Sequence, residues 1–168
     1  SKFIPAEDVI VPYGCSDLDD CERITQVLKM SLNDLRKKQV SGFYLDIDTV
    51  GYDGANGSDL QEKKNEIDGE SAGNYAMDDM AELFESHVDL DLEGFEDINP
   101  KTGEPSGIKL PYIVTIDKSS NQVLSIYRNY NPTDPLRKKN DYFVHYKFLP
   151  GLGFYGFGLI HMIGGLTR

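Results

Sequence analysis

The chain has 168 residues, a length that suits one domain, and its formal net charge is −11. The charge is local, because residues 46–100 carry 17 acidic and two basic side chains, whereas residues 101–168 carry four acidic and nine basic ones. An acidic segment repels phosphate backbones and argues against tight, sequence-neutral DNA binding by that surface. No apolar run approaches the roughly 18–20 residues of a membrane span, so we expect no membrane association.

The two cysteines, Cys15 and Cys21, stand six residues apart in a polar stretch. They are too few for a disulfide framework and lack the paired spacing of a zinc site, so we expect two free thiols and a reducing compartment. The chain begins at Ser1 without Met and reads like mid-protein sequence from its start. We therefore expect an internal fragment of a larger protein.

The first third of the chain predicts two strands and a helix. Residues 8–11 are rich in β-branched side chains and read as a short strand. Residues 23–30 fit both a strand and a helical face, and we favour a strand. Ser31, followed by Asp34, resembles a capping-box start and predicts a helix that ends before Gly42.

The middle of the chain is an acidic, loop-rich excursion over residues 46–82. It is rich in Gly, Asn, Asp and Ser and nearly lacks aliphatic side chains, so it can contribute little core. A second cap-like pattern at Ser58 predicts one helix within it. Residues 83–92 then alternate apolar and polar side chains, which predicts a half-buried strand.

The last third carries the clearest strand signals. Residues 111–130 predict a β-hairpin with a turn at residues 118–121, and residues 141–148 alternate again and predict a further strand. A glycine-aromatic turn leads into an apolar helix start at Leu159. We therefore predict a single domain over residues 1–168, of the α+β class, with a mainly antiparallel sheet, one or two packing helices and a long acidic loop region.

Two acidic runs resemble the opening of a calcium-binding EF-hand loop: Asp46-x-Asp48 and Asp89-x-Asp91-x-Glu93-Gly94. Both fail at the twelfth position, where a bidentate carboxylate is needed and Gly57 and Pro100 stand instead. Neither has flanking helices. We interpret both runs as solvated acidic chain and predict no metal site.

The three histidines, His87, His145 and His161, show no metal-ligand spacing. One of them could pair with Cys15 or Cys21 in a thiol-dependent hydrolase, or a hydrolase could use a metal held by the aspartate-rich segment. A stand-alone acidic binding module is another alternative. We favour structural roles and predict that the chain is not an enzyme, with no catalytic residue and no cofactor.

The segment from Pro150 contains Gly-x-Gly-x-x-Gly, formed by Gly151, Gly153 and Gly156. This spacing is typical of dinucleotide-binding loops, but the bulky Phe154 within it and the lack of preceding α/β alternation argue against that function. We interpret the glycines as sites of close packing around docked aromatic side chains.

Several stretches resemble the portal proteins of short-tailed, podovirus-type bacteriophages. The resemblance lies in structural residues: Ile4-Pro5-Ala6-Glu7-Asp8-Val9-Ile10-Val11-Pro12-Tyr13-Gly14, Met30-Ser31-Leu32-Asn33-Asp34-Leu35, Gly42-Phe43-Tyr44, Leu110-Pro111-Tyr112-Ile113-Val114-Thr115-Ile116-Asp117, Val123-Leu124-Ser125-Ile126-Tyr127-Arg128-Asn129-Tyr130, and residues 141–156. It covers both ends of the chain, skips the acidic middle and includes no catalytic signature.

The resemblance implies a structural role in a ring, usually of twelve identical subunits, at one vertex of the capsid. DNA passes through such a ring during packaging and ejection without specific binding, and the ring docks the packaging motor (the terminase), the capsid and the tail. This chain would then be an internal portion, from the wing region and reaching toward the stem or clip. Its location would be the virion, and the cytoplasm of the bacterial host before assembly.

Ring contacts join one face of a subunit to a different face of the next. We therefore predict that the acidic middle of one subunit meets the basic residues Arg137, Lys138 and Lys139 of its neighbour.

Overall fold

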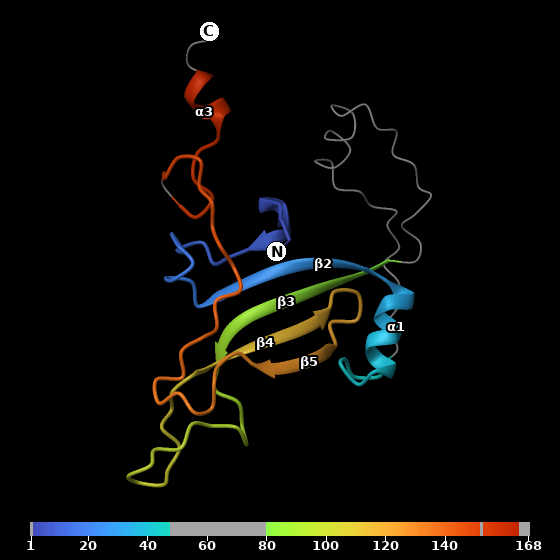
Figure 1. The fold of residues 1–168 in the computed structure, drawn as a ribbon, viewed down its shortest axis with the longest axis vertical. Helices are drawn as coiled ribbons and strands as arrows, with labels where there is room; N and C mark the ends of the chain where they lie inside the picture. Colours follow the sequence, from blue (N-terminus) through green and yellow to red (C-terminus); the bar gives the residue numbers. More distant parts are fainter. Residues whose placement is uncertain (1, 48–79, 152, 165–168) are drawn as a thin grey trace. The chain divides into compact units, whose positions relative to one another are not determined.

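The structure is a computed structural model that describes residues 2–47, 80–151 and 153–164. Its main feature is a five-stranded antiparallel sheet in which every strand lies beside its neighbour in sequence, in the order β1-β2-β3-β4-β5 (Figure 1). The strands are β1 (Val9–Ile10), β2 (Arg23–Ser31), β3 (Met80–Leu90), β4 (Leu110–Asp117) and β5 (Val123–Arg128). The helical elements are η1 (Ala6–Asp8), α1 (Leu32–Val40) and α3 (Leu159–Ile163). The antiparallel sheet and helix α1 agree with the predicted mainly antiparallel sheet with one or two packing helices.

The ambiguous segment at residues 23–30 is a strand, as favoured from the sequence. Strand β2 pairs with β1 in antiparallel register, with Val9 opposite Gln26 and Ile10 opposite Thr25. Three consecutive residues of β2, from Ile24 to Gln26, are buried. Burial of adjacent residues requires cover on both faces of a strand, since successive side chains point to opposite faces.

Helix α1 begins and ends where its sequence predicts. The Ser31 hydroxyl accepts a hydrogen bond from the Asp34 backbone N–H at 3.1 Å, which satisfies one of the unpaired donors of the first turn. At the other end, Gly42 adopts a positive φ of 77°, a conformation that glycine reaches without steric cost. Both ends of the predicted helix are therefore confirmed.

The described chain divides into two compact units whose boundaries fall within β2, β3, β4 and β5. The first unit contains Ser1–Gln26, Glu85–Val114 and Ile126–Arg168, and the second contains Val27–Phe84 and Thr115–Ser125. Each unit is described by itself. The single domain over residues 1–168 stays a prediction.

The second unit has an apolar core below helix α1. The core consists of five buried side chains from α1, β3, β5 and the loop after α1: Leu35, Tyr44, Ala81, Leu83 and Leu124. The Leu45 backbone N–H donates to the Leu124 carbonyl oxygen at 2.8 Å. Gln39, which is buried on α1, donates to the Ile47 carbonyl oxygen at 2.8 Å. These bonds tie the chain after α1 to the core.

The hairpin formed by β4 and β5 is closed by a buried aspartate. One carboxylate oxygen of Asp117 accepts hydrogen bonds from the hydroxyls of Ser119 and Ser120, both at 2.6 Å, and from the Ser120 backbone N–H at 3.0 Å. Asn121 completes the turn with a φ of 56°, a left-handed conformation that asparagine tolerates. The predicted hairpin and its turn are confirmed.

The first unit is organised around a disulfide between Cys15 and Cys21, and the prediction of two free thiols is wrong. The loop between the two cysteines brings their Cα atoms to 5.3 Å, within the range that a disulfide spans. Both cysteines are buried with Ile24 and Phe154 in one apolar cluster. Spacing alone did not reveal this loop closure, and the inference of a reducing compartment loses its basis.

Residues 141–148 do not form the predicted strand. Pairing begins with an isolated bridge between Tyr130 and Lys139 and with a hydrogen bond from the Asn140 backbone N–H to the Asn129 carbonyl oxygen at 2.9 Å, but it does not continue. A strand needs a neighbouring backbone to complete its ladder. The alternation of apolar and polar side chains indicates which of them face the protein. It does not show whether another strand lies beside the segment.

Most of the acidic excursion predicted for residues 46–82 lies outside the described residues, as does the helix predicted from Ser58. At its end, residues 80–82 already belong to β3, because Ala81 is buried and extends the apolar side of the strand. Among the described residues, no helix is long and apolar enough to cross a membrane.

Candidate functional site

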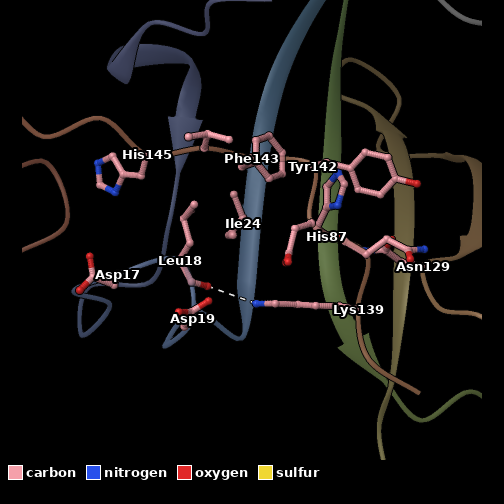
Figure 2. Close-up of a pocket in the computed structure, with 13 residues that line it drawn as sticks. Asp17, Leu18, Asp19, Ile24, His87, Asn129, Lys139, Tyr142, Phe143 and His145 are labelled. Carbon is pink, nitrogen blue, oxygen red and sulfur yellow. Dashed lines mark hydrogen bonds between the residues drawn. The ribbon is translucent and has the colours of Figure 1, made fainter. Parts of the chain in front are cut away.

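The described part of the first unit contains a pocket of about 510 Å³. It is lined by the loop between the cysteines, by single residues of β2 and β3, by the residue after β5, and by the extended segment from residue 139 onward (Figure 2). The lining residues are Asp17, Leu18, Asp19, Ile24, His87, Asn129 and residues 139–145. The pocket brings together two of the three histidines noted in the sequence.

His87 reaches the pocket from β3 and is enclosed by aromatic rings. Its ring meets the Phe143 ring edge-on at a centroid distance of 4.8 Å and the Tyr142 ring at 5.4 Å. Its Nε2 lies 3.4 Å from a carboxylate oxygen of Glu85. His87 therefore acts as a packing residue that holds residues 142 and 143 against β3 (Figure 2).

His145 lies on the opposite part of the pocket wall from His87 in Figure 2. Its ring stacks on Phe154 at a centroid distance of 4.3 Å, and its buried Nδ1 has no hydrogen-bond partner among the described residues. Burial lowers the pKa of His145, and the nearby positive charge of Lys147 lowers it further, while Asp17 opposes the shift. His145 is thus favoured in its neutral form.

Asn129, which follows β5, is only 2% exposed. Its backbone N–H donates to the Pro111 carbonyl oxygen at 2.9 Å, and its side-chain amide approaches the Asn140 carbonyl oxygen at 3.4 Å. Its side-chain oxygen is buried and has no hydrogen-bond partner in the part of the chain that the structure describes. Asn129 therefore anchors the start of the extended segment, and the sequence analysis missed it because an asparagine before Tyr130 and Asn131 reads as an ordinary turn residue.

Two lysines attach the extended segment to the cysteine loop. Lys147 donates to the Ser16 carbonyl oxygen at 2.7 Å and to the Asp17 carboxylate at 2.5 Å. The hydrogen bond and charge of Lys147 lower the pKa of Asp17. Lys139 donates to the Leu18 carbonyl oxygen at 3.2 Å (Figure 2). These contacts link residues about 120 to 130 positions apart in the sequence.

The three basic residues predicted for contacts between subunits differ in their surroundings. Arg137 forms an ion pair with Asp97 of the same chain, and Lys139 is held by the Leu18 carbonyl oxygen. Lys138 is exposed, and within the described residues its ammonium group has no partner. Lys138 is therefore the member of the three that is available to a second subunit.

The histidine and cysteine residues do not form the site that a thiol hydrolase requires. Cys15 and Cys21 are joined to each other, so neither sulfur is a thiol. None of the side chains that line the described pocket is a cysteine, serine or threonine, and the side chain of His161 lies outside the described residues. His87 and His145 thus have no nucleophile of these types beside them in the pocket.

The acidic run that begins at Asp89 follows the end of β3. The Glu96 carboxylate accepts a hydrogen bond from the Gly94 backbone N–H at 2.9 Å. Hydrogen bonds from the backbone N–H groups of Glu96 and Gly94 lower the pKa of Glu96. Asp89, Asp91 and Glu93 are exposed. Among the described residues, no group of three or more acidic, histidine or cysteine side chains is placed to hold a metal ion.

The glycine-aromatic segment is closely packed at two of its glycines. A Cβ on Gly156 would lie 2.6 Å from the Leu149 carbonyl oxygen, and one on Gly151 would overlap the Phe157 ring. Phe154 is buried beside the disulfide. These contacts agree with the interpretation that the glycines permit docking of aromatic side chains.

No protein-family model matches this sequence, and no curated protein shows significant similarity to it. The interpretation of the site therefore rests on its own contacts.

Proposed function

We propose that this chain is part of the portal protein of a short-tailed bacteriophage and is a structural component of the ring through which DNA is packaged and ejected. The proposal starts from the resemblance of the strands at both ends of the chain to that family. In such a ring, twelve copies would surround the DNA and would contact the packaging motor, the capsid and the tail, in the virion and, before assembly, in the bacterial cytoplasm.

The observation that carries the proposal is the exposed apolar surface of residues 141–148. Three aromatic side chains and one valine of this segment are more than half exposed, although Tyr142 also contacts the His87 ring: Tyr142, Val144, Tyr146 and Phe148. Apolar side chains gathered on one exposed face are typical of surfaces that are covered in an assembly. An assembly subunit accounts for this face, whereas a monomeric hydrolase gives it no use.

The charge distribution also supports passage of DNA without specific binding. Residues 46–100 have a net charge of −15, from 17 acidic and two basic side chains. Negative charge of this density repels phosphate and favours a duplex that slides rather than adheres. We also propose that the chain lies in the wing region of the portal and has no enzymatic activity.

The alternatives have less support from the described residues. The thiol hydrolase has lost its nucleophile to the disulfide between Cys15 and Cys21. A stand-alone acidic binding module would account for the charge of the middle segment but not for the aromatic face of residues 141–148. The portal proposal accounts for both.

Electron microscopy of the complete gene product tests the proposal. The expected result is a population of closed rings with a central channel. A preparation that remains monomeric over the concentrations and salt conditions at which portal subunits assemble would overturn it.

Charge reversal tests the predicted contact between subunits. Lys138→Glu should reduce ring yield and make the rings dissociate at lower salt, because it replaces an attractive contact with repulsion. Lys101→Glu is a matched control, since Lys101 is exposed but lies outside the basic segment. Equal yields and equal salt resistance of the two variants would contradict the contact. Arg137→Glu is less informative, because it also breaks the ion pair with Asp97 within the chain.

A further inference from the structure

Residues 141–148 are fixed to the protein on one side and open on the other. The side chains of Phe143, His145 and Lys147 face inward, where Phe143 packs on the cysteine cluster, His145 stacks on Phe154 and Lys147 binds the cysteine loop. The alternate side chains are exposed, with exposed fractions of 62% for Tyr142, 75% for Val144, 89% for Tyr146 and 64% for Phe148. The segment thus presents one continuous apolar row, which we call the outer row.

The backbone of this segment is also available for pairing. Within the described residues, no backbone N–H or carbonyl group of residues 142–148 takes part in a hydrogen bond with another backbone group. An extended backbone with unpaired groups can accept a neighbouring chain by strand addition. The outer row and the free backbone therefore offer both apolar area and directional hydrogen bonds.

The charge around the outer row indicates what can cover it. Residues 136–149 contain four basic side chains and the single acid Asp141. Arg137 and Lys147 are paired with Asp97 and Asp17 of the same chain, so Lys138 and Lys139 carry the remaining positive charge. A second copy that presented the same face would bring these positive charges together, which is unfavourable. A contact between two identical faces is therefore disfavoured, and an acidic surface is the better match.

The same chain carries an acidic and partly apolar surface after β3. Residues 89–98 contain five acidic side chains and no basic ones, and they expose the large apolar side chains of Phe95 and Ile98. Asp97 is paired with Arg137 of the same chain, so the other four acids carry the charge of this stretch. We call this stretch the acidic surface. It is complementary to the outer row in charge and offers apolar partners for its aromatic rings.

The exposed aromatic area is large enough to matter in an interface. An aromatic side chain buries roughly 150–250 Å² when it is fully covered. Three such side chains would supply a large share of the roughly 800 Å² per partner that a standard interface buries. A contact between two unlike faces of one chain is heterologous and can close into a ring.

We propose that the outer row of residues 141–148 packs against the acidic surface of residues 89–98 on a second copy of this chain. This inference rests on the proposed ring function and adds the two surfaces that join adjacent subunits. Lys138, next to the outer row, then meets Asp89, Asp91 or Glu93 of the second copy.

Site-specific photo-crosslinking tests the contact directly. The complete gene product is co-expressed as two differently tagged copies, and one of them carries the photoreactive residue p-benzoylphenylalanine in place of Tyr146. Irradiation should give a product that carries both tags, and mass spectrometry should locate the attachment within residues 89–98. The same probe in place of the exposed Tyr13 is the control and should give no product at residues 89–98.

The position of the cross-link decides the outcome. Attachment within a single copy, to another region of the second copy, to a different protein, or no product at all would overturn the inference. Rings observed by microscopy without the expected cross-link would leave the portal function in place while the inference fails. The expected cross-link without rings would support the contact and overturn the portal function.

Two variants at Tyr146 test whether the surface that contacts the outer row is acidic. Tyr146 is exposed, so either substitution should leave the fold unchanged, which circular dichroism can check. Tyr146→Glu should weaken association about tenfold more than Tyr146→Lys, because only the glutamate repels an acidic partner. Equal weakening by both variants, or no weakening by either, would contradict an acidic partner surface.

Discussion

Strand β4 and residues 141–148 are both extended stretches, yet their surroundings differ completely. Strand β4 lies between β3 and β5, and six of its eight residues are buried. Residues 141–148 have no adjacent strand in the described chain, and none of them is buried. The difference teaches that an alternating pattern defines two faces of a chain, while the neighbouring backbone determines whether those faces become core or surface.

The largest expected effect is on the free energy of unfolding, and it separates a core leucine of the hairpin from a valine of the outer row. Leu124→Ala should lower the free energy of unfolding by about 2–5 kcal/mol, because Leu124 is fully buried among Leu35, Tyr44 and Leu83. Val144→Ala should change it by less than about 0.5 kcal/mol in the isolated subunit. Urea denaturation of both variants measures the two values. Similar losses would show that the outer row is already covered within one subunit.

The next effect concerns the turn that closes the hairpin. Asp117→Ala should cost about 1.5–3 kcal/mol, because it removes the charged acceptor of three hydrogen bonds from Ser119 and Ser120. Asp134→Ala is the matched control, since Asp134 accepts two backbone hydrogen bonds in an exposed turn before the outer row. It should cost clearly less. A larger loss for the control would contradict the importance of the buried turn.

The same aspartate predicts an acid-dependent loss of stability. Burial raises the pKa of Asp117, but the hydrogen bonds from Ser119 and Ser120 outweigh burial and hold the pKa below its ordinary value of 3.8. The folded-state pKa is therefore depressed, and its contribution is present above about pH 3.8 and is lost as the pH falls through the folded value. The difference in unfolding free energy between wild type and Asp117→Asn should shrink in that acid range. A difference that stays constant to pH 2 would contradict the shift.

A smaller loss of stability is expected for Asn129, which anchors the start of the segment that carries the outer row. Asn129→Ala should cost about 1 kcal/mol, because it removes the weak side-chain contact to the Asn140 carbonyl oxygen and leaves the backbone bonds in place. Hydrogen exchange should rise at the Asn140 amide, which donates to the Asn129 carbonyl oxygen, and stay unchanged in β4. An equal rise in both would show that Asn129 supports the whole unit rather than the start of this segment.

The sequence predicted the elements whose signals are local. The cap at Ser31, the turn at Asn121 and the choice of a strand for β2 each follow from residues within a few positions, and the structure agrees. The disulfide between Cys15 and Cys21 and the missing ladder at residues 141–148 depend on how distant segments meet, which a short window does not contain.

The pocket was the part of the structure least predictable from the sequence, because it too depends on how distant segments meet. His87 and His145 were recognised as candidates, but their shared wall depends on contacts of Phe143 and Phe154 that no spacing encodes. Asn129 carried no signal beyond that of a turn residue. Positions of single side chains in a pocket are set by packing between segments far apart in the sequence, so a pattern of residue types cannot locate them.

The smallest expected effect is a pH dependence of residues 141–148, through the inward-facing His145. Burial, and then the charge of Lys147, lowers the pKa of His145, with Asp17 opposing, so the folded segment favours the neutral ring stacked on Phe154. A depressed histidine pKa means that the contribution is complete above the ordinary value of 6.5 and is lost as the pH falls through the folded value.

The NMR signals of the Phe154 ring, which stacks on His145, should therefore move toward their positions in the unfolded chain as the pH is lowered below 6.5, while the amide signals of β4 should not. His145→Phe keeps an aromatic ring for the stack and removes the titration, so it should flatten this response. The same pH response in wild type and His145→Phe would assign the opening to another group, with His87 on the same pocket wall as the first to test. A response confined to wild type would show that the inner side of the segment is held in part by a neutral histidine, and that the outer row can be released without unfolding the sheet.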